Sequence, residues 1–399
     1  MERLKPAIPR SFSHSNSVKI VLSCLLCFFM QVRPVQADPP QIGKQSKGAS
    51  INQTMAQIGT TLMDLYPYIL DQDSDHMLEN RGLIATQVNR LIFLLKSAQP
   101  HFLHRSKTFQ VSYDVLIGHL SETQKAIARD NMRYAYSLLN EVSSICSSCH
   151  TQDQRQRTLF KDGKRARFNS DFQFAEFNFL TRNYPVAVRY YEKTLQNQSK
   201  DQRKNMMALD RVLTIYVQVQ NQPGTAARFF EKYKDTDNVD ALTKRSMQQW
   251  IPALRQLDKN KTGANPNFTQ LEQEVHEYLG SLQEAGATLA PTKTQKVFHL
   301  WLQGRLYRYL STATATEVPK LLYWLALNAR ATKHSYYFSL ADLYLKQCML
   351  EYSRHDYARK CFEEYKESVE FSYSGSIGTH IPQEVQQELN RLKAIVHSK

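Results

Sequence analysis

The sequence Cys146-Ser147-Ser148-Cys149-His150 decides how the rest of the chain is interpreted. At the spacing C-x-x-C-H, two thiols can add to the vinyl groups of a haem while the following histidine ligates the iron. Residues three apart lie on the same side of a helical turn, so both sulfurs can reach one edge of the porphyrin. We therefore predict one covalent haem c attached at Cys146 and Cys149, with His150 as the proximal iron ligand.

A C-x-x-C pair has two other interpretations. It can be a thioredoxin-like redox pair, which usually opens a helix in a strand–helix unit, or half of a zinc site, which needs a second pair of ligands. Neither context is visible in the sequence, since Cys348 and Cys361 stand thirteen residues apart with no partner pair nearby. Haem attachment is also the interpretation that agrees with the start of the chain.

Residues 1–37 have the pattern of a secretory signal peptide. Basic side chains precede an apolar run at 20–30, which is shorter than the roughly 20 residues that a membrane-spanning helix needs. Val35-Gln36-Ala37 offers a small-residue cleavage pattern, so the mature chain is expected to begin at Asp38. Because c-type haem is attached outside the bacterial cytoplasm, the expected location is the periplasm.

Two other interpretations of this segment remain open. Val21-Leu22-Ser23-Cys24 resembles a lipoprotein cleavage site, although its use would leave the apolar residues 25–30 in the mature protein. An uncleaved segment would instead anchor the chain and would still place the remainder in the periplasm. Membrane association is expected only if the segment stays uncleaved.

The net charge indicates the kind of partner that the protein attracts. Five basic side chains and one acidic side chain fall in the first 37 residues, which leaves +10 of the chain's +14 on the remainder. A basic surface favours acidic partners and raises association rates with them at low salt. We expect an acidic redox protein as the partner. No nucleic acid is expected, because the chain has an export signal and no base-reading motif.

Four helical stretches lead up to the cysteine motif, and residues 38–50 before them are polar and predicted to be a disordered leader. Each stretch repeats apolar side chains at the spacing of one buried helix face. They are residues 51–69, residues 79–98, residues 108–129, and a stretch that begins near Asn131 and enters the motif. Short connections between helices of this length favour an antiparallel four-helix bundle over residues 51–160.

Residues 51–157 resemble the cytochrome c-prime family, whose haem motif lies near the end of the fourth helix of a bundle. Many other soluble cytochromes c have the motif near the N-terminus of the mature chain. The family's first helix often carries a large residue followed four positions later by a glycine, as Met55 and Gly59 do here. In the low-spin members that residue is a methionine bound to iron, so the resemblance implies Met55 as the distal ligand. It also implies a homodimer through the bundle, as many bundle cytochromes form.

Other assignments of the distal site stay open. A methionine on an apolar helix stripe is often simply part of the core, and Met63 lies on a nearby face of the same helix. In gas-binding members of the family an apolar residue leaves the sixth iron position open. Family members often carry a basic residue soon after the proximal histidine, which only Arg155 approaches here. Four histidines are weaker candidates for the distal ligand: His76, His101, His104 and His119.

The second half of the chain resembles a tetratricopeptide repeat region. Each such repeat has a small residue in both of its helices and an aromatic residue four positions after the second. Ala175, Ala187 and Tyr191 fit this spacing, and less regular copies occur at 213–230 and 341–362. We predict an all-α chain in which a tetratricopeptide-like domain over residues 168–397 follows the bundle.

Cys348 and Cys361 would then lie on paired helices near the turn that joins them. In an oxidising compartment this pair can form a disulfide, and two buried free thiols are the alternative. The many tyrosines of this half indicate either an aromatic-lined partner groove or repeat core with hydroxyls at its rim.

Three functions follow from these patterns. The first is a periplasmic monohaem c-type cytochrome that transfers electrons, with the helical repeats docking a protein partner. The second is a haem sensor that binds nitric oxide or carbon monoxide, and the third is a scaffold in which the haem is structural. An enzyme is not expected, because the sequence has no catalytic triad, phosphate-binding loop, paired carboxylates or distal acid–base pair.

Overall fold

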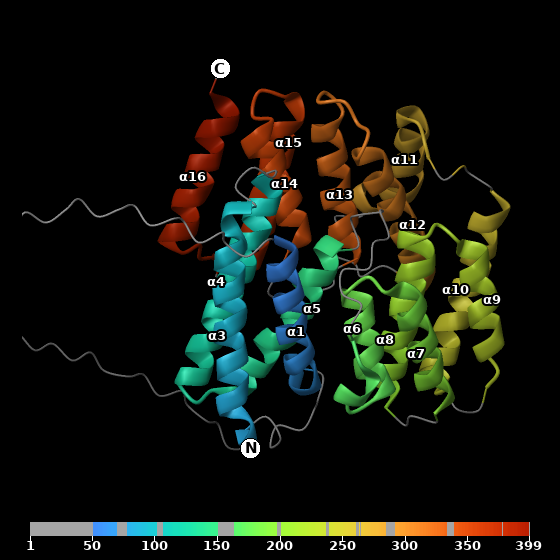
Figure 1. Cartoon of the computed structure of the whole chain (residues 1–399). Coiled ribbons are helices and arrows are strands. Elements are labelled where there is room, and N and C mark those ends of the chain that lie inside the picture. Colours follow the sequence, from blue (N-terminus) through green and yellow to red (C-terminus); the bar gives the residue numbers. More distant parts are fainter. Residues whose placement is uncertain are drawn as a thin grey trace, which may run out of the picture. The chain divides into compact units, whose positions relative to one another are not determined.

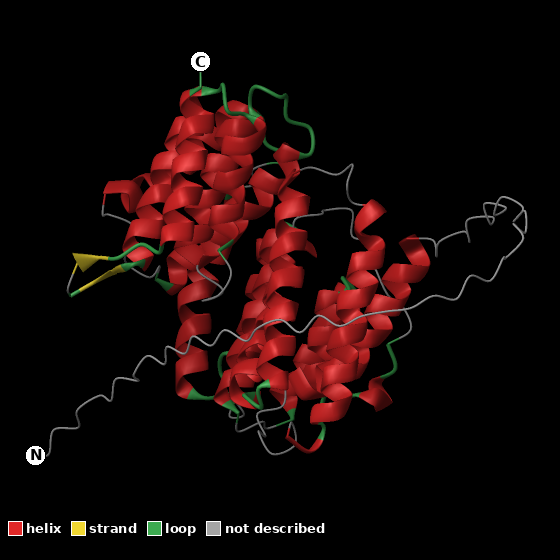
Figure 2. Ribbon diagram, turned by 90° about the vertical axis from the view of Figure 1, so that its left-hand side faces the viewer, coloured by secondary structure: helices red, strands yellow, loops and turns green. Residues whose placement is uncertain are grey.

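Helices form nearly all of the chain that a computed structural model describes, as Figure 2 shows in red. The described residues are 51–69, 78–101, 107–150, 163–197, 201–236, 239–260, 263, 265–284, 292–332, 339–376 and 378–398. Within helices, the side chains of 51, 52, 101, 107–112, 143, 144, 146–150 and 281–284 are not described. The predicted signal peptide and leader lie outside these residues. The prediction of an all-α chain is confirmed for the described residues.

The first four α-helices agree with the four predicted stretches to within two residues at each end. They are α1 (Ile51–Ile69), α3 (Arg81–Ala98), α4 (Lys107–Ala128) and α5 (Met132–His150), and a short 3-10 helix η1 (Gln99–His101) follows α3. Helix α1 packs on α3, α3 on α4 and α4 on α5, and α1 also contacts α5 (Figure 1). Each helix therefore turns its apolar stripe toward its neighbours.

Polar contacts show that α3, α4 and α5 run in alternating directions. At the start of α3, Arg81 donates to Asp130 Oδ1 at 2.5 Å, and Asp130 takes a positive φ of 62° in the turn that joins α4 to α5. Near the other end of α3, the Tyr113 hydroxyl of α4 donates to the Leu95 carbonyl at 3.2 Å. The start of α4 and the end of α5 therefore lie at the same end of this group.

Most of the remaining helices pack on the next helix along the chain. The remaining helices are η2 (Arg165–Arg167), α6 (Asp171–Leu180), α7 (Tyr184–Gln196), α8 (Gln202–Leu213), a π-helical continuation η3 (Thr214–Val219), α9 (Pro223–Tyr233), α10 (Ala241–Lys259), α11 (Phe268–Glu284), α12 (Lys293–Leu310), α13 (Val318–Thr332), α14 (Leu340–Glu351), α15 (Asp356–Ser372) and α16 (Gln383–His397). Strand β1 (Ser374–Gly375) pairs antiparallel with β2 (Gly378–Thr379) between α15 and α16. Helix α10 was not among the predicted helices.

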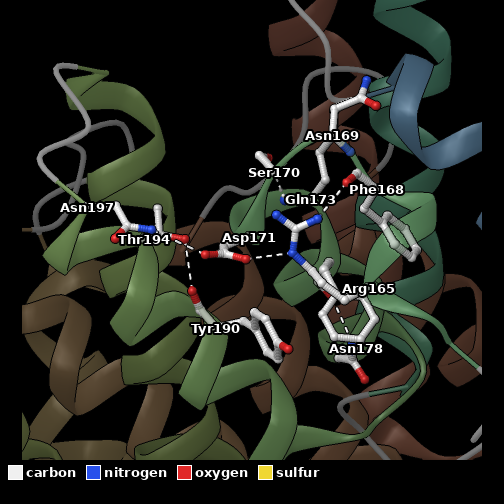
Figure 3. Close-up of polar contacts among 11 residues, drawn as sticks. Arg165, Phe168, Asn169, Ser170, Asp171, Gln173, Asn178, Tyr190, Thr194 and Asn197 are labelled. Atoms are coloured by element: carbon white, nitrogen blue, oxygen red, sulfur yellow. Dashed lines mark hydrogen bonds and ion pairs between the residues drawn. The ribbon is translucent and has the colours of Figure 1, made fainter.

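Hydrogen bonds and an ion pair stabilise the N-terminus of α6 (Figure 3). The Ser170 hydroxyl accepts from the backbone N–H of Gln173, which satisfies one of the free donors at the helix N-terminus. Arg165 donates to Asp171 Oδ1 at 2.6 Å, and Asn197 at the end of α7 donates to Asp171 Oδ2 at 3.2 Å. The carboxylate in the first turn also suits the positive end of the helix dipole.

One hydrophobic core runs from α1 to α16, and residues 49–399 form one compact unit. Tyr66 of α1 packs edge-on against Phe177 of α6, so the core continues past the end of α5. The boundary proposed between residues 160 and 168 remains a prediction. Among the described residues, no helix has the length and apolar character to cross a membrane.

A glycine permits the closest approach between α12 and η3. A Cβ atom at Gly304 would lie 2.2 Å from the carbonyl oxygen of Gln218, well inside van der Waals contact. Helices can approach this closely only where a side chain is missing. Gly304 therefore fixes the packing of α12 against the π-helical segment.

Candidate functional site

The C-x-x-C-H motif occupies the last turns of α5. The backbone from Cys146 to His150 is helical, as the predicted attachment geometry requires. The side chains of Cys146, Cys149 and His150 lie outside the described ones, so their assignment as haem-attachment and iron-binding groups remains a prediction.

Positions 146 and 149 continue the buried stripe of α5. Val142 and Ile145 are each 1% exposed, and positions 146 and 149 each follow one of these residues by one helical turn. The stripe faces the neighbouring helices of the group. A group attached at these two positions would therefore start from the inward side of α5.

Met55 lies on the corresponding stripe of α1. It precedes the buried residues Ile58 and Gly59 by one turn, but its own side chain is 37% exposed. Met63, the alternative, is 5% exposed and packs in the core. Met55 thus lies at the exposed edge of the buried face of α1, and its role as an iron ligand remains a prediction.

The interior around these stripes is uncharged. Among the side chains that the structure describes in α1, α3, α4 and α5, no buried one carries a charge, and the buried polar residues include Thr54, Thr61 and Thr123. The hydroxyls of Thr61 and Thr123 donate to backbone carbonyls one turn earlier, both at 2.9 Å. Nε2 of His119 lies 2.6 Å from the Leu138 carbonyl, which gives this histidine a hydrogen-bonding role between α4 and α5. Such an interior suits a flat apolar group such as a porphyrin.

A helix from the C-terminal half reaches the motif end of α5. Leu343 of α14 is 3% exposed and forms a small buried cluster with Ile145, the residue before Cys146. Val115 and Leu116 of α4 and Leu340 of α14 pack around this pair. Helix α14 also packs along α4 (Figure 1). No sequence pattern indicates this contact, because about 200 residues separate its two sides.

Cys348 of α14 and Cys361 of α15 are fully buried and joined by a disulfide in the structure. Their Cα atoms are 6.4 Å apart, within the range that disulfides span. The two cysteines lie on consecutive helices close to the connecting turn, which is the placement predicted from the repeat pattern.

Buried charges gather in the C-terminal helices instead of near the motif. Tyr191 donates to Glu176 Oε1 at 2.5 Å, and Arg211 donates to both oxygens of the same carboxylate at 3.2–3.3 Å. Burial and then the neighbouring Glu176 raise the pKa of the Tyr191 hydroxyl well above its usual value. This network joins α6, α7 and α8, so its geometry supports a structural role.

A second buried ion pair joins α11 and α12. Arg305 is fully buried and donates to both oxygens of Glu274 at 2.6 and 2.7 Å. Its third contact is the Gly263 carbonyl at 2.6 Å, and its guanidinium lies 4.7 Å from the Trp301 ring centroid. Burial raises the pKa of the Glu274 carboxyl, although Arg305 opposes that shift. Neither ion pair was predictable from the sequence, because their partners are about thirty residues apart and share no motif.

Comparison with known proteins found no matching family model, no matching curated protein and no matching solved structure.

Proposed function

We propose that the protein is a periplasmic monohaem c-type cytochrome that transfers electrons. Haem c would be attached at Cys146 and Cys149, with His150 as the proximal ligand. What supports this proposal is that residues 146 and 149 each follow a buried residue of α5, Val142 or Ile145, by one helical turn. When bound, the haem would supply an iron centre that alternates between the ferrous and ferric states.

The proposed host is an antiparallel four-helix bundle made by α1, α3, α4 and α5, similar to the cytochrome c-prime family. The alternating directions of α3, α4 and α5 support this order. In such a bundle α1 begins at the end where α5 finishes, so Met55 and the motif share one end of the bundle. A thioether ligand from Met55 would favour the reduced state.

The C-terminal helices are proposed to be tetratricopeptide-like repeats that dock the redox partner. The predicted repeat alanines at 187, 226 and 358 are all fully buried, and so are the aromatic residues four positions later: Tyr191, Phe230 and Phe362. Burial at these positions is what stacked helix pairs require. The basic net charge favours an acidic partner.

The proposed location is the periplasm, reached through a signal peptide over residues 1–37. The disulfide between Cys348 and Cys361 supports this location, because disulfides persist in oxidising compartments. A homodimer through the bundle belongs to the same proposal.

The test is the optical spectrum of the exported full-length protein, oxidised and reduced, with and without carbon monoxide. We expect a covalent c-type haem that is lost in Cys146→Ser/Cys149→Ser. We also expect a low-spin spectrum that resists carbon monoxide in the wild type and in Met63→Ala, but not in Met55→Ala. Met63→Ala is the matched control, because it removes a methionine from the same helix.

Each result separates the proposed function from its competitors. A wild-type protein without covalent haem would reject the proposal. A high-spin protein that binds carbon monoxide readily would replace electron transfer with gas binding, which the 37% exposure of Met55 keeps as the second candidate. A partner that binds the haem-free variant as tightly as the wild type would indicate a scaffold.

A further inference from the structure

The contact between α14 and the end of α5 is small and separate from the main core. It consists of the buried residues Ile145 and Leu343, with Val115, Leu116 and Leu340 packed around them. Three helices, α4, α5 and α14, contribute to it. Because so few side chains take part, the burial of Ile145 depends directly on the presence of Leu343.

This contact lies next to the C-x-x-C-H motif. Ile145 immediately precedes Cys146, and position 149 lies one turn beyond Ile145 on the same helix face. A group attached at positions 146 and 149 would therefore lie next to the contact among α4, α5 and α14. The side chains of α14 that reach this end of α5 therefore border the proposed attachment site.

Helix α14 is held firmly in this position. The disulfide between Cys348 and Cys361 ties it to α15, and Lys346 pairs with Glu388 of α16 at 2.8 Å. Its N-terminus is capped by Ser339, whose hydroxyl accepts from the backbone N–H of Asp342 at 3.1 Å. These contacts lie on both sides of Leu343, so the leucine is presented to α5 by a fixed helix.

We infer that Leu340 and Leu343 are positioning residues that shield the attached haem from water, so that the C-terminal helices help to set its reduction potential. This inference rests on the proposed function. Burial of a haem in apolar surroundings disfavours the more highly charged ferric state and raises the potential. The C-terminal half would then complete the haem site in addition to docking a partner.

The test compares two leucine-to-alanine variants of α14 in the full-length protein. Leu343→Ala opens the contact with Ile145, whereas Leu345→Ala removes the same atoms from a fully buried position in the main core. We expect Leu343→Ala to lower the reduction potential and to change the haem spectrum. We expect Leu345→Ala to lower stability and leave both unchanged, and Leu343→Met to restore the wild-type potential.

The outcomes decide between shielding and simple packing. Equal potentials and spectra in Leu343→Ala, Leu345→Ala and the wild type would overturn the inference while leaving the haem in place. If Leu343→Ala fails to fold, the half-buried Leu340 gives a milder variant, Leu340→Ala, for which a lowered potential supports shielding and an unchanged one rejects it. A wild-type chain without haem would reject the proposed function and this inference together.

Discussion

The helices before and after residue 160 bury different kinds of side chain. None of the described side chains that are buried in α1, α3, α4 and α5 is charged, whereas α6 to α16 bury carboxylates, guanidinium groups, amides and a histidine. Threonine can satisfy its hydroxyl within its own helix, as Thr123 does with the His119 carbonyl. The Glu274 carboxylate instead accepts from Arg305, which lies on another helix.

The two regions differ in how their buried side chains select one packing arrangement of the helices. An uncharged interior selects its arrangement mainly by the shapes of the side chains that pack in it. A buried ion pair is costly if its partner is missing, so it excludes arrangements in which the two helices do not meet. The first suits a cofactor host, and the second suits a series of similar helices that have to stack in one order.

The largest effect is expected from Arg305→Met. The substitution leaves Glu274 buried without its partner, and breaking a buried pair in this way costs about 3–5 kcal/mol. Chemical denaturation would measure the loss in the free energy of unfolding. In the control, Arg305→Met combined with Glu274→Leu should recover most of that loss. If the single variant loses less than about 1 kcal/mol, buried charges do not specify this half of the chain.

A smaller effect is expected when the pH falls. Nδ1 of His299 donates to Asn328 Oδ1 at 3.0 Å, and burial lowers the pKa of this histidine, although Asn328 opposes that shift. Below the usual histidine pKa of about 6.5 the unfolded chain therefore binds more protons than the folded one. Stability is full above that pH and falls by at most about 1.4 kcal/mol per pH unit on acidification.

Unfolding measured between pH 8 and pH 5 would test this slope, with about one-unit steps across the histidine range. His299→Gln removes the titrating group and should flatten that part of the curve. An unchanged slope in His299→Gln would assign the pH dependence to other groups.

The smallest effect is expected from Thr123→Val in α4. The hydroxyl bonds only to a carbonyl of its own helix, so its loss should change the free energy of unfolding by less than about 1 kcal/mol. The matched substitution in the other half is Asn328→Leu, which leaves His299 without its side-chain partner and should cost about 1–3 kcal/mol. Equal losses for the two variants would remove the contrast between the regions.

The sequence predicted most helices because helix formation depends on local spacing. The apolar stripe of α1 and the Pro382 before α16 are both visible in a short window. Helix α10 was missed although its stripe includes the buried residues Met247, Trp250 and Leu254, and Pro252 within it resembles a helix end. The placement of Cys348 and Cys361 on paired helices was predictable because a single helix–turn–helix unit contains both residues, whereas the choice between a disulfide and free thiols was left open.

The candidate site was only partly predictable, because the sequence indicates local patterns and not contacts between distant helices. Its motif and Met55 lie in local patterns, so the sequence alone indicates them. The approach of Leu343 to Ile145 depends on how distant helices stack, and no spacing rule connects positions 145 and 343. The bond between Arg211 and Glu176 was missed for the same reason.

The link between α14 and α15 has a consequence for how the proposed cytochrome matures. If haem is attached as proposed, the exported chain would carry two cysteine pairs with opposite chemical needs: 348 and 361 would have to lose their hydrogens, whereas 146 and 149 would have to keep theirs until they add to the porphyrin. A wrong pairing between the two sets would block both reactions. Since only thirteen residues separate Cys348 from Cys361, their own short loop closes readily. Once Cys348 and Cys361 have formed their disulfide, neither can form a wrong disulfide with Cys146 or Cys149.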